Sequence, residues 1–285
     1  MEANILKRLL VAVIGRDTTL CAVHYGLDLA VASDEPVEVL IIQEVTASSD
    51  LVLAHGQAPG QGAARTARAA WEASKQTEHR IHKLANDRFL RTRFTHELGS
   101  TIDVLERCAG DASCIVITRS ASGMGGRLRT NVESIVRRTR KPVLLVPPRY
   151  QPLRRILVAY AGKELGELVL TTASNLAIAL DLPLEVVTVA AHCHECYRIQ
   201  ERAQRLLKHS AARVSFTQLA GDPAGRLSGR TAPDHVLVMG ASGHSRLYRL
   251  ILGSVTEHVI RSASGPVLVS SKPLPPERPS AQRPD

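Results

Sequence analysis

Residues 236–257 read VLVMGASGHSRLYRLILGSVTE, and this stretch decides which fold the chain adopts. Its first four residues are apolar without alternation, which is typical of a strand buried on both faces. The strand ends at Gly240, a basic segment follows, and Gly253 and Ser254 come directly before a segment with helical spacing. A buried strand that leads through a loop into a helix predicts an α/β fold built on a parallel sheet.

The chain contains this kind of unit twice. Residues 7–13 (KRLLVAV) resemble residues 154–160 (RRILVAY), and residues 141–146 (KPVLLV) resemble residues 265–269 (GPVLV). Each half therefore opens and closes with an apolar strand. The proline-rich segment 147–152 can continue neither a strand nor a helix, so it is interpreted as the linker between two domains.

Strand and helix periods alternate along both halves. We predict strands over residues 9–14, 37–45, 93–97, 114–118 and 142–146, and again over 155–160, 184–190, 212–219, 235–239 and 266–270. Helices are predicted over about 63–90 and over 165–180, 194–209, 222–231 and 254–263. The predicted fold class is α/β, with two tandem Rossmann-like domains, each a five-stranded, mostly parallel sheet with helices on both faces. The predicted domains are residues 1–148 and 153–273, followed by a disordered, proline-rich tail, 274–285.

The composition argues against several classes of protein. The 285 residues are 44% hydrophobic and 22% charged, as in ordinary globular proteins, and only 3% are aromatic. Few aromatic residues argue against a base-stacking surface, and the net charge of +9 is spread along the chain, so no nucleic-acid partner is predicted. We find neither a signal peptide nor an apolar run of about 18 residues, and the 5 cysteines are odd in number. We therefore expect a cytoplasmic protein with reduced thiols and no membrane contact.

The loop between Gly240 and Ser254 has the chemistry of an anion-binding site. Gly240 and Gly243 allow a positive φ and a close approach of the backbone to a ligand. Gly253 and Ser254 present N–H groups at a helix N-terminus, and Arg246 can neutralise phosphate charge. The alternative is a plain glycine turn with Ser254 as the helix N-cap, and the residues alone leave both interpretations open.

The spacing of these residues resembles that of a known family. Gly240, Gly243, Gly253 and Ser254 follow the pattern Gly-x2-Gly-x9-Gly-Ser/Thr, which nucleotide-binding universal stress proteins carry after their fourth strand. The flanking segments are also similar to that family, and the resemblance covers nearly the whole chain as two tandem domains. It implies that the closing strands of the two halves, 143–146 and 267–269, meet across a pseudo-twofold axis. Their apolar composition fits burial at such a junction.

The resemblance also implies a function and a set of binding residues. It implies a stress-response protein that binds ATP or another adenine nucleotide, with Mg²⁺ left open as an accompanying ion. The residues implied around the phosphates are Gly240, Gly243, Gly253, Ser254 and Val255. The residues implied for the adenine pocket, at two strand ends, are Val189 and Met239.

Two departures from the family pattern bear on where a nucleotide binds. After the strand 155–160, Ala161 stands where nucleotide-binding members usually have Asp, which removes one polar anchor. In the first half Ser120 is aligned with Gly240, and the loop from there to Thr130 is four residues shorter than its counterpart. We therefore expect any nucleotide in the second half and a degenerate pocket in the first.

The sequence leaves several hypotheses open about what the bound nucleotide does. Neither a catalytic base nor metal-binding carboxylates can be named, so a nucleotide-dependent regulator or sensor is favoured over slow ATP hydrolysis. A scaffold with a vestigial pocket is the third hypothesis. Cys193 and Cys196 are interpreted as part of a strand-to-helix junction, with a metal or redox role as the alternative. Dimerisation of two chains and the identity of a protein partner stay open.

Overall fold

The computed structural model describes residues 7–15, 19–44, 61–119, 128–163, 165–191, 193–241 and 252–270. Of residues 61–70, 128–131 and 193 it describes the backbone alone. The predicted tail 274–285 lies outside the described residues.

The two halves contain the same succession of strands and helices. The first half has the strands β1 (Arg8–Ile14), β2 (Val37–Gln43), β3 (Thr92–Leu98), β4 (Ala112–Thr118) and β5 (Val143–Val146), and the helices α1 (Cys21–Ser33), α3 (Gln61–Asn86), α4 (Thr101–Cys108) and α5 (Leu128–Thr139). The second half has the strands β6 (Arg155–Ala159), β7 (Leu184–Ala190), β8 (Val214–Ala220), β9 (His235–Gly240) and β10 (Val267–Ser270), and the helices α6 (Gly166–Ala179), α7 (Cys193–Leu207), α8 (Pro223–Ser228) and α9 (Ser254–Ser262). Each predicted strand is present, with its ends shifted by no more than two residues.

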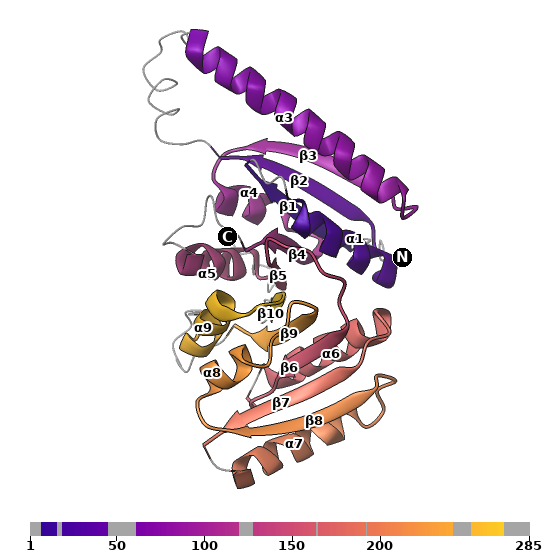
Figure 1. The fold of residues 1–285 in the computed structure, drawn as a ribbon, viewed down its shortest axis with the longest axis vertical. Coiled ribbons are helices and arrows are strands. Elements are labelled where there is room, and N and C mark those ends of the chain that lie inside the picture. The colour runs from indigo at the N-terminus through magenta and orange to yellow at the C-terminus, as the bar shows by residue number, and fades with distance from the viewer. Residues whose placement is uncertain are drawn as a thin grey trace, which may run out of the picture.

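The strands of both halves form one continuous sheet of 10 strands, in the order β3-β2-β1-β4-β5-β10-β9-β6-β7-β8 (Figure 1). All neighbours within a half are parallel, and β5 and β10 are antiparallel. Each half thus has the same strand order, read from opposite edges of the sheet. The α/β class with two tandem, mostly parallel halves is confirmed.

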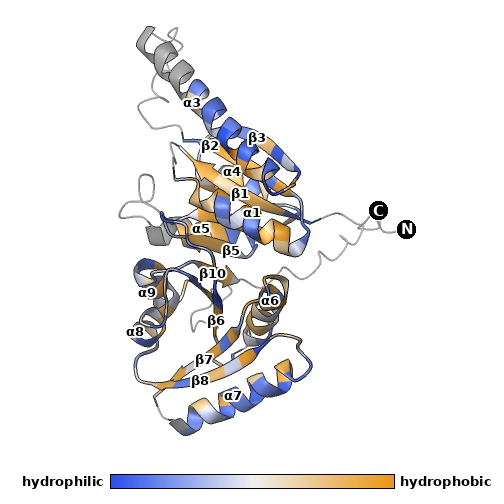
Figure 2. Cartoon of the chain, turned by 45° about the vertical axis from the view of Figure 1, so that its right-hand side comes forward, coloured by the Kyte–Doolittle hydropathy of each residue, from blue (hydrophilic) through white to orange (hydrophobic). Residues whose placement is uncertain are grey.

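Helices cover both faces of this sheet, which explains the uninterrupted apolar runs of the central strands. In β1, Leu9, Val11 and Val13 pack with α1 and α3, whereas Leu10 and Ala12 pack on the side of α4 and α5. The same alternation places α6 and α7 on the first face and α8 and α9 on the second. Figure 2 shows the result: hydrophobic residues concentrate on the central strands, and hydrophilic residues follow the described part of α3 and α7.

The closing strands of the two halves meet at the centre of the sheet. Val267 pairs with Leu145, Leu268 with Leu144, and Val269 with Val143. These side chains are all buried, so neither strand leaves an open edge. This pairing confirms the expectation that strands 143–146 and 267–269 adjoin.

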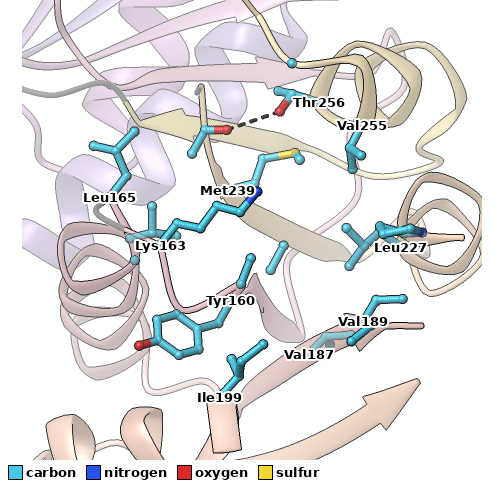
Figure 3. Close-up of a pocket in the computed structure, with 18 of the residues that line it drawn as sticks. Tyr160, Lys163, Leu165, Val187, Val189, Ile199, Leu227, Met239, Val255 and Thr256 are labelled. Carbon is cyan, nitrogen blue, oxygen red and sulfur yellow. Dashed lines mark hydrogen bonds between the residues drawn. The ribbon is translucent and has the colours of Figure 1, made fainter. Parts of the chain in front are cut away.

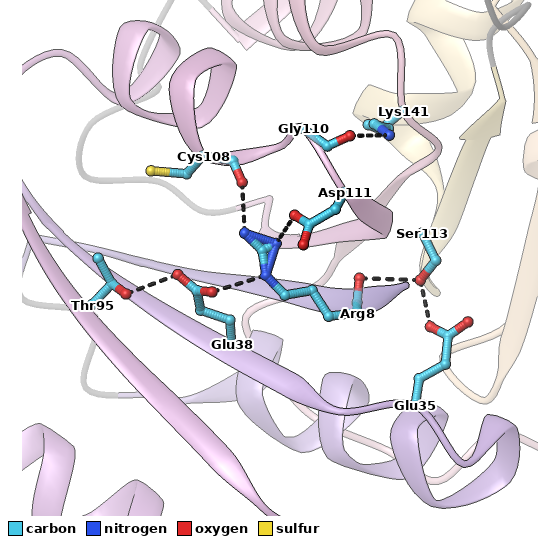
Figure 4. Close-up of polar contacts among 9 residues, drawn as sticks. All are labelled: Arg8, Glu35, Glu38, Thr95, Cys108, Gly110, Asp111, Ser113 and Lys141. Atoms are coloured by element: carbon cyan, nitrogen blue, oxygen red, sulfur yellow. Dashed lines mark hydrogen bonds and ion pairs between the residues drawn. The ribbon is translucent and has the colours of Figure 1, made fainter. Parts of the chain in front are cut away.

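Each half also buries one glutamate on its second strand. Glu38 of β2 accepts hydrogen bonds from Arg8 Nε at 2.8 Å and from Thr95 Oγ1 at 2.8 Å, and Arg8 also pairs with Asp111 (Figure 4). Glu185 of β7 occupies the matching place. It accepts from Thr217 Oγ1 at 2.7 Å, from Arg155 Nη1 at 3.1 Å and from Arg230. Because buried charges need partners, the repeated Glu-Arg-Thr cluster is a structural feature of both halves.

The Glu185 cluster makes the stability of the protein depend on pH. Burial alone would raise the pKa of Glu185, but hydrogen bonds from Thr217 and Arg230 outweigh it and hold that pKa below its ordinary value. A carboxyl with a lowered pKa stabilises the fold above its unfolded-state pKa of about 4.3, and this contribution is lost as the pH falls through the folded-state pKa. We expect Glu185→Gln to lower the free energy of unfolding by about 1–3 kcal/mol at pH 7.

The measurement is urea unfolding at several pH values between 7 and 3. The difference between the wild type and Glu185→Gln should shrink as the pH falls. Glu167→Gln is the control, because that carboxylate belongs to an exposed pair with Arg202 and should leave the unfolding midpoint unchanged. A difference that is constant over the whole range would contradict the assignment.

Gly265, just before β10, allows a backbone approach that no other residue permits. A Cβ atom there would lie 2.2 Å from the carbonyl oxygen of Ala232 and 2.3 Å from that of His235. We expect Gly265→Ala to lower the free energy of unfolding by about 3 kcal/mol, because the backbone on both sides has to move. Gly110→Ala is the matched control, since a Cβ atom at Gly110 meets nothing within 4 Å. Equal thermal midpoints of the two variants would show that the contact is not restrictive.

Candidate functional site

A cavity of about 640 Å³ opens at the carboxyl ends of β6, β7 and β9 (Figure 3). In a parallel sheet, ligands typically bind at the carboxyl ends of the strands, because the strands end there and the following helices begin. The residues around the cavity come from these strands, from the turns that follow β6 and β7, and from the N-terminal parts of α6, α7, α8 and α9. They include six residues singled out from the sequence: Val189, Met239, Gly240, Gly253, Ser254 and Val255.

Apolar side chains form much of the cavity wall. Val187 and Val189 come from β7, Met239 from the end of β9, and Leu227 from α8. Figure 3 shows these side chains around one open space. A wall of this kind suits a flat apolar group such as a heterocyclic base.

The N-terminus of α9 contributes the polar part of the cavity. Gly253 precedes the helix in an extended conformation, with φ −65° and ψ 149°, and Ser254 is the first helical residue. The N–H groups of Ser254, Val255 and Thr256 have no acceptor within the helix, since the first intrahelical bond runs from Glu257 N to Gly253 O at 2.9 Å. Ser254 is therefore not the N-cap, and the capping alternative raised from the sequence is wrong. The helix dipole favours an anion at these N–H groups.

The same helix end is tied to β9. Thr256 Oγ1 donates a hydrogen bond to the carbonyl oxygen of Gly240 at 3.1 Å (Figure 3). Gly240 itself continues the strand and does not adopt a positive φ, so the expectation that it would adopt one is wrong. A Cβ atom at Gly240 would lie 3.6 Å from atoms of Leu165 and Val169, which is an ordinary contact. Glycine at this position leaves space in the cavity and does not relieve backbone strain.

The turn after β6 forms another part of the wall. Ala161 and Lys163 line the cavity, and Gly162 between them has a φ of +65°, which only glycine adopts readily. Ile199 of α7 packs against this turn, because its side chain lies 3.4–3.9 Å from the Cβ position of Gly162. Ala161 was expected near the ligand site from the sequence, whereas Lys163 and Glu195 were not expected as lining residues. The available signal was that both follow buried strands, Lys163 in the turn before α6 and Glu195 in the first turn of α7.

Two of the predicted binding residues cannot be placed. Gly243 and Arg246 lie outside the described residues, in the segment 242–251. Their expected contacts with phosphate stay predictions.

The register of the sheet corrects the comparison between the halves. Val143 pairs with Ile115 and Thr118 with Val146, whereas Val267 pairs with Leu237 and Gly240 with Ser270. Thr118 therefore occupies the place of Gly240, and the sequence alignment that put Ser120 there is wrong by two residues. The error arose because the loop between strand and helix differs in length between the halves.

The helix that follows this loop in the first half begins earlier than expected. Helix α5 begins at Leu128, two residues before Thr130. Thirteen residues separate Gly240 from the start of α9, and nine separate Thr118 from the start of α5. The first half thus has four residues fewer at the corresponding corner, as expected.

Of the two cysteines Cys193 and Cys196, only Cys196 has a described side chain. The thiol of Cys196 is buried and lies 3.7 Å from the carbonyl oxygen of Leu219, so it points toward the sheet. The side chain of Cys193 is outside the described atoms. Among the described residues, no group of three or more His, Cys, Asp or Glu side chains gathers in a way that could hold a metal ion. None of the described helices is both long and apolar enough to cross a membrane.

Both halves of the chain match the same known protein family. The model of the universal stress protein family matches residues 6–147 and, separately, residues 152–271. A universal stress protein from Synechocystis sp. is 32% identical over 181 residues, which is 61% of this chain and 63% of that protein. The chain thus aligns with less than two thirds of the length of this relative.

Solved structures of the same architecture include proteins with different roles. A universal stress protein from Archaeoglobus fulgidus matches with a TM-score of 0.68 and 17% identity, over 93% of this chain and 98% of that one. The cytoplasmic domain of a prokaryotic cation chloride cotransporter matches with a TM-score of 0.53 and 13% identity, over 92% of this chain and 94% of that one. These likenesses support the fold, and a fold by itself does not assign an activity. From the matches of the family model over both halves, the chain belongs to the universal stress protein family and carries the family's domain twice in tandem.

Proposed function

We propose that this protein is a cytoplasmic, nucleotide-dependent regulator of the stress response that binds an adenine nucleotide through its second domain, residues 153–273. The observation that carries the proposal is that one cavity combines an apolar wall with a helix N-terminus whose first N–H groups have no acceptor within the helix. A nucleotide needs both, because its base is flat and largely apolar whereas its phosphates are anionic.

The proposed binding residues follow from this arrangement. Val189 and Met239 contact the base, and the first turn of α9 binds the phosphates. The phosphate-binding residues in the proposal are Gly240, Gly253, Ser254 and Val255, together with Gly243 and Arg246 from the segment outside the described residues. The first domain, residues 1–148, has a shorter loop at the matching corner and is proposed not to bind nucleotide.

Binding without rapid turnover fits the side chains around the cavity. Phosphoryl transfer needs a positioned base and usually a metal held by carboxylates. Glu195 is the carboxylate among the described lining residues, and no second one accompanies it there. In this proposal, any Mg²⁺ that accompanies the nucleotide is held by phosphates and water. A regulator of this kind also needs a protein partner to read its state.

Ser254→Pro tests the helix N-terminus directly. Proline is favoured at the first helical position, and Gly253 already has the extended backbone that a following proline requires. The change removes one N–H donor and keeps the helix. We expect ATP affinity to fall about tenfold or more, because hydrogen bonds to charged groups contribute about 1.5–3 kcal/mol. Isothermal titration with ATP, ADP and AMP measures this loss.

Ser254→Ala is the matched control, because it removes the hydroxyl and keeps the N–H group. It should retain more affinity than Ser254→Pro. Thermal unfolding without ligand should show that both variants are folded. Equal affinities of the two variants would contradict a phosphate site at these N–H groups.

Gly240→Val tests which half binds the nucleotide. Its side chain would enter the space beside Leu165 and Val169, and we expect ATP affinity to fall by about tenfold or more, because that volume is no longer open to ligand. Thr118→Val makes the change at the matching register position of the first half and should leave affinity unchanged. Loss of binding in Thr118→Val alone would place the nucleotide in the first half. A wild-type protein that binds none of the nucleotides would favour a scaffold, and release of phosphate from bound ATP would favour a slow hydrolase.

A further inference from the structure

The described walls of the cavity carry two charged side chains, Lys163 and Glu195. Glu195 is the third residue of α7, it is exposed, and it makes no ion pair with a described residue. A carboxylate that lines a cavity, with no cation of the described residues at hydrogen-bond distance, can accept hydrogen bonds from a ligand.

The position of Glu195 follows from the packing of α7. Glu195 and Ile199 are four residues apart on one helix, so they lie on the same face, one turn from each other. Ile199 packs against the turn at Gly162 with contacts of 3.4–3.9 Å to its Cβ position. Glu195 therefore lies one turn nearer the N-terminus of α7 than Ile199, and it lines the cavity together with Ala161 of the turn that Ile199 contacts.

The anion site and Glu195 lie at opposite ends of the cavity. Strand β6 lies between β9 and β7 in the sheet, so two strand spacings, about 10 Å, separate β9 from β7. The N-terminus of α9 is tied to the end of β9 through Thr256, whereas Glu195 follows β7. A ligand that fills this cavity has its anionic group at one end and meets a carboxylate at the other.

We propose that Glu195 is a specificity-determining residue, which accepts hydrogen bonds from donor groups on the nucleoside part of the ligand. This inference rests on the proposed nucleotide site and adds a chemical requirement to it. The donors that an adenine nucleotide offers at its nucleoside end are the ribose hydroxyls and the exocyclic amine of the base. A carboxylate only accepts, so a ligand that presents an acceptor at the same place is disfavoured.

The experiment compares four nucleotides on three proteins by isothermal titration. ATP has all the donors, 2′-deoxy-ATP and 3′-deoxy-ATP each lack one ribose hydroxyl, and ITP has an oxo group in place of the amine. The proteins are the wild type, Glu195→Gln, and Glu201→Gln, a control on the same helix that does not line the cavity. We expect Glu195→Gln to lower ATP affinity about tenfold, and Glu201→Gln to leave it unchanged.

The four nucleotides identify the donor. The analogue that lacks the contacted group should bind the wild type about as weakly as ATP binds Glu195→Gln, and it should lose little more on that variant, since the two changes remove the same contact. A wild type that binds ATP with Glu195→Gln unchanged for all four nucleotides would overturn this inference alone. A wild type that binds none of the four would overturn the proposed nucleotide site and this inference with it.

Discussion

The pairing of β5 with β10 is the constraint on which the rest of the structure depends. Three residue pairs join two parallel sheets into one, and they do so in antiparallel orientation. Consequently the strands of the two halves run in opposite directions. The carboxyl ends of the strands in one half lie on the same side of the sheet as the amino ends of the strands in the other half. The corresponding corners of the two halves are therefore far from each other, and the described residues that line the cavity all belong to the second half.

Hydrogen bonds from Arg119 reinforce the junction between the halves. Arg119, just after β4, donates to the carbonyl oxygens of Ile260 at 2.9 Å and Gly265 at 3.2 Å. The first of these acceptors belongs to the C-terminal end of α9, where the helix dipole favours a cation. Burial lowers the pKa of Arg119, but arginine stays charged at neutral pH. The helix whose N-terminus is the proposed phosphate site is thus held at its other end by the first half.

The linker is fixed in a similar way. Tyr150 hydrogen-bonds Asp28 of α1 at 2.5 Å, and the backbone N–H of Gln151 donates to Tyr25 Oη at 3.2 Å. The ring of Tyr150 also stacks on His24, with ring centroids 4.8 Å apart. These contacts attach the segment between the halves to α1, so the linker is part of the packed structure.

The sequence by itself determined the duplication, the positions of the strands and the corner of the sheet at which the cavity opens. These follow from local patterns, since a strand covered on both faces has to be apolar throughout and a glycine-rich turn has to follow it. Tertiary structure decided the rest. The match of Thr118 to Gly240 depends on hydrogen-bond register between neighbouring strands, and the extended φ of Gly240 depends on its pairing with Ser270. Lys163 and Glu195 reach one cavity because the turn before α6 packs against α7, which spacing along the chain does not encode.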